Sequence, residues 1–74
     1  MGNNTLNPRE REVLQLVYEG LRNEEIAKKL NVSIHTVKVH LANIFYKLDI
    51  QNGRLELMAR RIKELENGIR RIYF

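Results

Sequence analysis

The 74-residue chain contains no cysteine, which excludes disulfide bonds, thiolate metal sites and cysteine nucleophiles together. It also has no apolar run that approaches the roughly 20 residues of a membrane-spanning helix. Its polar start, MGNNT, lacks the hydrophobic region of a signal peptide. Nothing therefore points to an oxidising compartment or to membrane targeting, and we expect a cytoplasmic protein that does not contact a membrane.

Catalytic and metal-binding patterns are missing as well. His35 and His40 lie five residues apart, about 140° apart around a helix, so they cannot share a metal ion. The lone Ser33 is explained as a helix cap rather than as a nucleophile. Three glycines fall at helix boundaries and not in a phosphate-binding loop: Gly20, Gly53 and Gly68. We expect no enzymatic activity, no metal and no cofactor.

Acidic residues are absent from one long stretch of the chain. No Asp or Glu occurs between Glu25 and Asp49, whereas four lysines do: Lys28, Lys29, Lys38 and Lys47. The formal net charge is +4, and basic residues are also in excess in the C-terminal third. Basic patches favour polyanions such as nucleic acid. Lysines and arginines on helices also solvate ordinary protein surfaces, so charge alone leaves both interpretations open.

The pattern of apolar residues predicts an all-α fold, a four-helix bundle that contains a helix-turn-helix. Asn7 and Pro8 begin the first helix, with Glu10 completing a capping box, and Gly20 ends it. Asn23 is the expected cap of the second helix. The expected helices cover about 8–19, 24–30, 34–48 and 54–66, within a domain at 6–67 that lies between a disordered segment at 1–5 and a tail at 68–74.

The helix expected over 34–48 organises the rest of the chain. Its apolar stripe must face a core, and consists of Val37, Leu41, Ile44 and Leu48. Asp49 falls where a left-handed residue would end the helix, with Ile50 folding back onto Phe45. The opposite face carries no acid and fits a DNA groove; it consists of His35, Lys38, Val39, Ala42 and Tyr46.

The last helix is expected to serve assembly, because a core of this size is marginal on its own. Helices one to three can close a core through Val13, Leu14, Val17, Ile26, Leu30, Val37, Leu41 and Ile44. The stripe of the fourth helix is Leu55, Met58, Ile62 and Leu65. Its first part should dock on the domain, and a homodimer interface is expected at Met58, Ile62, Leu65 and Ile69. The alternative is that the C-terminal tail covers this surface within one chain.

Four segments resemble one family. LNPREREVL at 6–14, NEEIAKKL at 23–30, VSIHTVKVH at 32–40 and NIFYKL at 43–48 are similar to the LuxR-type helix-turn-helix, and the match spans 6 to about 59. The resemblance implies a bacterial DNA-binding domain that regulates transcription, often as the output of a response regulator or a quorum-sensing regulator. It also implies that the third helix lies in the major groove and the fourth at a dimer interface.

The resemblance carries over to individual positions. Lys38 and Val39 match base-reading positions of the family, and Asn23, Thr36 and His40 match positions near phosphates. We also expect His35 and Ala42 to contact bases, and Lys47 and Arg54 to contact phosphates. The sequence departs from the family at four positions: Ala42, where some members have a basic residue; Asp49, in place of a usual Gly; Gly53, an extra residue before Arg54; and Leu55, in place of a usual Thr.

Two other readings remain open. The promoter-binding fourth region of a bacterial sigma factor shares REREVL, EIA and SxxTVK, although the continuation KVHLANI argues against it. A protein-interaction module would use the fourth helix and the arginine-rich tail to bind a partner helix or an anionic membrane surface. A DNA reader should lose affinity steeply with salt, whereas such a module should not. RNA polymerase stays open as a further partner of a transcriptional regulator.

Overall fold

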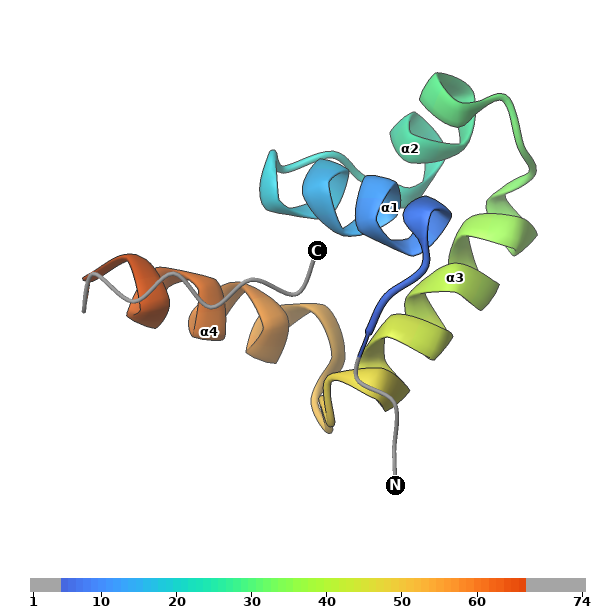
Figure 1. Ribbon diagram of the computed structural model, residues 1–74. Helices are drawn as coiled ribbons and strands as arrows, with labels where there is room; N and C mark the ends of the chain where they lie inside the picture. Colours follow the sequence, from blue (N-terminus) through green and yellow to red (C-terminus); the bar gives the residue numbers. More distant parts are fainter. Residues whose placement is uncertain (1–4, 67–74) are drawn as a thin grey trace.

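The computed structural model describes residues 5–66 and contains four helices and no strand in that range (Figure 1). They are α1 at Pro8–Tyr18, α2 at Asn23–Leu30, α3 at Ile34–Lys47 and α4 at Gly53–Glu66. Each differs from its predicted range by one residue at one end, and the all-α prediction is confirmed. The expectations for the first four residues, for Gly68 and Ile69 and for the 68–74 tail lie outside the described residues.

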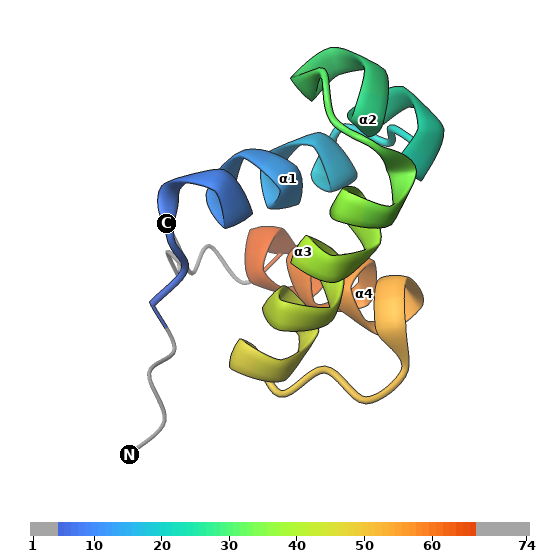
Figure 2. The same cartoon turned by 90° about the vertical axis from the view of Figure 1, so that its right-hand side faces the viewer.

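The helix α3 crosses α1 and α2 and packs against both. The helix α4 lies behind α3 in the view of Figure 2. Three residues join α2 to α3, Asn31 to Ser33, and this short turn makes the predicted helix-turn-helix. Asn31 adopts a left-handed conformation with φ of 58°, which ends α2 and redirects the chain into α3. The outer side of α3 is left uncovered by the other helices.

Apolar residues from all four helices and the intervening turns form one core. Its buried members are Leu6, Val13, Leu14, Leu16, Val17, Ile26, Ala27, Val37, Leu41, Ile44, Leu48, Ile50 and Leu57. The stripe predicted on α3 is therefore confirmed in full. Leu30, predicted to be buried, is only partly buried and packs against the edge of this cluster.

Both ends of α3 follow the predicted local chemistry. The Ser33 hydroxyl accepts a hydrogen bond from the Thr36 N–H at 3.0 Å and caps the first turn. Asp49 has φ of 57°, and the Ile50 N–H donates to the Phe45 carbonyl at 2.7 Å, which is the expected left-handed ending. Since Ile50 is also buried, this ending fixes the path of the chain toward α4.

The predicted cap of α2 was wrong. Asn23 is the first residue of the helix, and Arg22 occupies the cap position without a capping side chain. The Arg22 N–H is instead satisfied by the Glu25 carboxylate at 2.7 Å. The Asn23 side chain has a different partner, because its Oδ1 accepts a hydrogen bond from Arg54 on α4. Asn23 therefore connects two helices that are far apart in the sequence.

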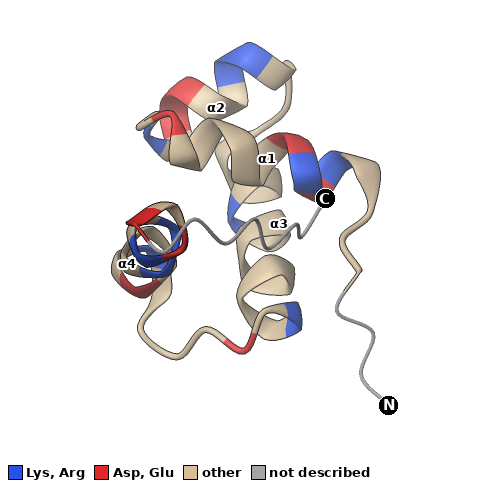
Figure 3. Ribbon diagram, turned by 60° about the vertical axis from the view of Figure 1, so that its left-hand side comes forward, with Lys and Arg blue, Asp and Glu red and all other residues tan. Residues whose placement is uncertain are grey.

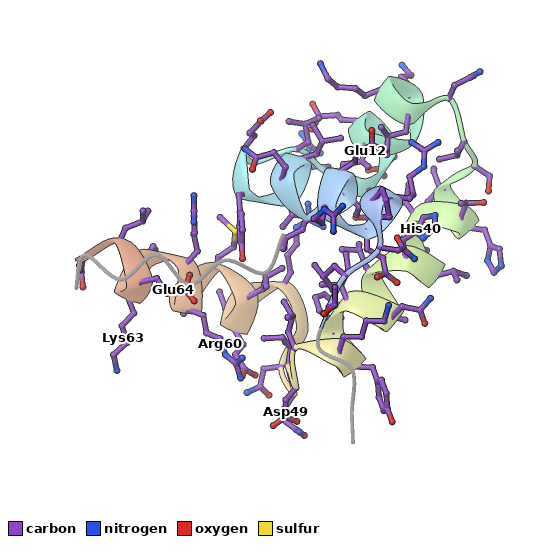
Figure 4. All side chains as sticks on the ribbon, viewed as in Figure 1. Glu12, His40, Asp49, Arg60, Lys63 and Glu64 are labelled. Carbon is purple, nitrogen blue, oxygen red and sulfur yellow. The ribbon has the colours of Figure 1, made fainter. Side chains whose placement is uncertain are left out.

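The docking face of α4 was predicted correctly at Met58, which packs against the core, and wrongly at Leu55. Leu57, which the predicted stripe omits, is 1% exposed, whereas Leu55 is 80% exposed. Three arginines on the same side as Leu57 attach α4 to the domain. Arg54 donates to Asn23 and to the Leu21 carbonyl, Arg60 donates to the Leu48 and Asp49 carbonyls, and Arg61 lies over the Tyr18 ring. Figure 4 shows Arg60 beside the turn that carries Asp49.

Candidate nucleic-acid interface

One side of α3 is exposed along its whole length and has no acidic residue. We call it the outward face; its members are His35, Lys38, Val39, Ala42, Asn43 and Tyr46. Figure 3 shows basic residues and no acidic residue on α3, and the next acidic residue along the chain is Asp49, in the turn that follows. All four predicted base-contact residues, His35, Lys38, Val39 and Ala42, lie together on this face. Their contact with DNA itself stays a prediction.

Lys38 is the free cation of the outward face. It is exposed, and among residues 5–66 it forms no ion pair or side-chain hydrogen bond. Val39 next to it is 44% exposed, an apolar side chain held in solvent. The combination offers one charged donor and one methyl-bearing surface side by side. A DNA site that presents a hydrogen-bond acceptor next to a methyl group would match both the Lys38 donor and the apolar surface of Val39.

A hollow of about 430 Å³ borders Lys38 and brings predicted residues from three helices together. It is lined by Arg22, Asn23, Glu24, Ile34, Lys38 and Arg54. Asn23 and Arg54, both predicted near phosphates, are bonded to each other at 2.8 Å in its wall. The first turns of α2 and α3 meet here, and their N–H groups favour anions; Glu24 in the same wall opposes them, but the three cations Arg22, Lys38 and Arg54 outnumber it. Arg22 and Ile34 were not predicted for this region, because only the crossing of the helices brings them there.

Lys38 lies at one edge of the outward face, and Thr36 and His40 lie at the other. Thr36 is two residues before Lys38 and His40 two residues after it, and two residues correspond to a rotation of about 200° around the helix. Both are half-buried, and the Thr36 hydroxyl lies 2.9 Å from the Ser33 hydroxyl. The predicted phosphate positions thus flank the outward face on both sides. This arrangement is the one expected of a helix whose edges meet two DNA strands.

Lys47, predicted to contact a phosphate, forms an ion pair within the domain, and its contact with DNA stays a prediction. Its Nζ lies 2.8 Å from Oε1 of Glu10, a carboxylate that is 2% exposed and is the buried charged residue of the described core. Oε1 also accepts the Asn7 N–H at 2.9 Å. Burial tends to raise the pKa of Glu10, but the hydrogen bonds from Lys47 and Asn7 and the nearby charges lower it below its usual value. Lys47 therefore holds α3 to the start of α1.

Residues 5–66 include no group of three or more histidines, cysteines, aspartates or glutamates that could hold a metal ion. Within the same residues, no helix is long and apolar enough to cross a bilayer. The described structure has an exposed, acid-free face on α3. Beside this face, the N-termini of α2 and α3 border the hollow described above, which we call the basic hollow because Arg22, Lys38 and Arg54 line it.

Comparison with known proteins decides the family. The model for bacterial regulatory proteins of the luxR family matches residues 4–58, which include α1, α2, α3 and the start of α4. The chain belongs to the LuxR family. The LuxR-type helix-turn-helix predicted from the four segments is thereby confirmed, and with it DNA binding in transcription regulation as the biochemical class of the domain. The family gives no indication of an enzyme.

Several curated relatives of this LuxR-type domain are longer regulators. The monoamine regulon transcriptional regulator of Klebsiella aerogenes is 47% identical over 55 residues, which cover 74% of this chain and 24% of the relative. The tetrathionate response regulatory protein TtrR of Salmonella typhimurium is 39% identical over 67 residues, which cover 90% and 32%. The response regulatory protein YgeK of Escherichia coli is 43% identical over 60 residues, or 81% and 40%. The chain thus spans well under half the length of these relatives.

Proposed function

We propose that this domain binds one specific duplex DNA sequence, with the outward face of α3 in the major groove. The observation that supports the proposal is the exposed, acid-free outward face with its free Lys38, opposite a fully buried stripe. The major groove is about 12 Å wide and admits one α-helix. Lys38 donates to guanine O6 or N7, Val39 packs on a thymine methyl group, and His35 and Ala42 contact neighbouring base edges.

Phosphates on either side of the groove fix the position of the helix in this proposal. On one side the first turns of α2 and α3 present N–H groups, with Asn23 and Arg54 in the wall of the basic hollow. On the other side Thr36 and His40 face the second strand. These contacts orient α3 but carry no sequence information, so specificity depends on the outward face.

The central prediction is that Lys38→Ala weakens binding to the best duplex by about 1–3 kcal/mol and relaxes the preference at one base pair. The fold should survive, since Lys38 is exposed and forms no ion pair or side-chain hydrogen bond within residues 5–66. Titration at fixed salt on the best duplex and on a random duplex measures the effect. Lys63→Ala is the matched control, because Lys63 is an exposed lysine on α4 that points away from the domain (Figure 4). Equal losses on both duplexes would show that Lys38 touches only phosphate.

We propose further that two copies pair through α4, because symmetric readers gain discrimination by placing two recognition helices across a two-fold axis. Ile62 and Leu65 are 54% and 62% exposed, and Met58 at the same side is only partly buried. Leu55, exposed as well, extends this apolar surface toward the start of the helix. Arg60 forms an ion pair with Glu56 of its own chain at 3.0 Å, which lessens the repulsion between two copies. Ile69, predicted at the same interface, lies outside the described residues.

Ile62→Asp should abolish this pairing, because it places a charge in the centre of the apolar surface. We expect the parent chain to be mostly monomeric alone and dimeric on a duplex with two half-sites, and the variant to stay monomeric on both. Sedimentation across a concentration series measures this, with Gln15→Asp on α1 as a variant that adds the same charge at another exposed site. A parent that remains monomeric on two half-sites, with Ile62→Asp binding equally well, would contradict the dimer.

The role in the cell that we propose is the DNA-binding part of a longer response regulator that acts in the bacterial cytoplasm. Two of the relatives are named response regulatory proteins, and this chain covers 32% and 40% of their lengths. RNA polymerase is the further protein partner in this proposal. Binding of purified polymerase to the domain on its duplex, compared with the duplex alone, tests that contact; equal binding to both would contradict it.

A further inference from the structure

Tyr46 is an exposed aromatic residue that the fold does not use. Its side chain is 87% exposed, more than that of any other large apolar residue among those described. It forms no hydrogen bond or ring contact within residues 5–66. A ring in this position gains nothing from the core, because the buried stripe of α3 lies on the opposite side. An explanation for Tyr46 must therefore come from outside the folded domain.

The position of Tyr46 on the helix places it among the predicted DNA contacts. It follows Val39 by seven residues, so the two side chains lie within about 20° of each other around α3 and about 10 Å apart along its axis. His35, eleven residues before Tyr46, shares this direction. Tyr46 thus lies near the middle of the outward face around the helix but at its C-terminal end along the axis, about two turns beyond Val39.

The second half of α3 has no free cation with which to bind a phosphate. Lys47 is bonded to the buried Glu10, and the exposed Asp49 follows in the turn. The C-terminal end of a helix is also its negative end, so a phosphate cannot approach it as it can approach the first turns of α2 and α3. A neutral donor that extends outward from the helix can bind a phosphate there. Of the neutral donors in this half of the outward face, Asn43 and Tyr46, the tyrosine is the longer.

The length of the outward face indicates where Tyr46 would lie. From His35 to Tyr46 it runs about 16 Å along α3, and the recognition helix of a helix-turn-helix contacts base edges with its N-terminal residues. With His35, Lys38 and Val39 against the base edges, Tyr46 comes to the border of the groove, where the phosphates are. We propose that the Tyr46 hydroxyl donates a hydrogen bond to a backbone phosphate oxygen beyond the base pairs that Lys38 and Val39 read. This inference rests on the proposed function.

Tyr46→Phe, which removes only the hydroxyl, tests the inference. We expect binding to the best duplex to weaken about 10- to 100-fold, the usual effect of one hydrogen bond to a charged group. Binding to a random duplex should weaken by the same factor, because a phosphate is present in every sequence. The dependence of affinity on salt should not change, since no charge is lost. Melting temperatures of variant and parent should agree.

Tyr18→Phe is the matched control. Tyr18 is on α1, where Arg61 of α4 lies over its ring, so the same hydroxyl is removed away from the outward face. We expect it to bind DNA as the parent does. A Tyr46→Phe variant that binds as tightly as the parent would overturn the inference. A second result would also overturn it. If Tyr46→Ala binds the thymine-containing duplex more weakly than the parent does, but both bind equally well once one thymine is replaced by uracil, then the Tyr46 ring reads a methyl group. If the parent itself binds no duplex, the proposed function fails; if the parent binds and only the Tyr46→Phe result fails, the proposed function stands.

Discussion

Leu41→Ala should destabilise the domain by about 2–5 kcal/mol, although Leu41 lies in the helix that we propose reads DNA. Leu41 is 5% exposed and packs in the core between Val37 and Ile44. Its truncation removes apolar burial and leaves a cavity, and a small domain has only about 5–15 kcal/mol of stability to lose. We expect the melting temperature to fall by at least about 10 °C. Thermal unfolding followed by circular dichroism measures this directly.

Val39→Ala is the matched control for Leu41→Ala. Val39 is two residues away on the same helix but lies on the outward face, 44% exposed. Val39→Ala should leave the melting temperature almost unchanged and weaken DNA binding. Leu41→Ala should do the reverse: its melting temperature should fall, but it should bind DNA like the parent at a temperature where it is folded. If Leu41→Ala melts like the parent, the two faces of α3 have been assigned the wrong way round.

Lys47→Met should destabilise the domain by about 3 kcal/mol at pH 7, because it leaves the buried Glu10 carboxylate without its cation. The Lys47 side chain is 26% exposed, so water moderates the effect on its side of the pair. In the double variant Glu10→Gln/Lys47→Met no buried charge remains, and the amide oxygen of Gln can still accept the Asn7 N–H. We therefore expect the double variant to be more stable than Lys47→Met alone. Urea unfolding of the three proteins measures the differences.

The effect of Lys47→Met should depend on pH in a fixed direction. The pKa of Glu10 is lowered in the folded protein, so its ion pair contributes fully above the ordinary glutamate pKa of about 4.3. The contribution is lost as the pH falls through the lowered folded value. The gap in stability between parent and Lys47→Met should accordingly be largest near pH 7 and shrink in acid. A gap that is constant from pH 7 to acid would show that lost packing, not lost charge, destabilises the variant.

The parts of the fold that short sequence segments determine could be predicted. The two faces of α3 follow from spacing within one helix, and its ending at Asp49 and Ile50 follows from adjacent residues. The outward face could be predicted for the same reason, because residues opposite a buried stripe must face solvent. Asn43 could have been included on the same periodicity.

The contacts between distant segments could not be predicted from local patterns. Glu10 and Lys47 are 37 residues apart, and each looks like an ordinary surface residue in its own helix. On α4 the apolar stripe suggested the wrong docking face at Leu55, because Leu57 is accompanied by arginines that bind carbonyls and a tyrosine ring rather than by apolar neighbours. The local sequence around Asn23 indicates a helix cap, but the Asn23 side chain instead accepts a hydrogen bond from Arg54, 31 residues away.

Selection of bound duplexes from a random library, carried out with the parent chain and with Lys38→Ala, tests most directly whether the outward face of α3 reads DNA. We expect the parent to enrich one shared sequence. Lys38→Ala should enrich the same sequence with one base pair relaxed, while its melting temperature stays that of the parent. A parent that enriches no common sequence, or a Lys38→Ala variant that selects the parent's sequence at every position, would contradict the proposal.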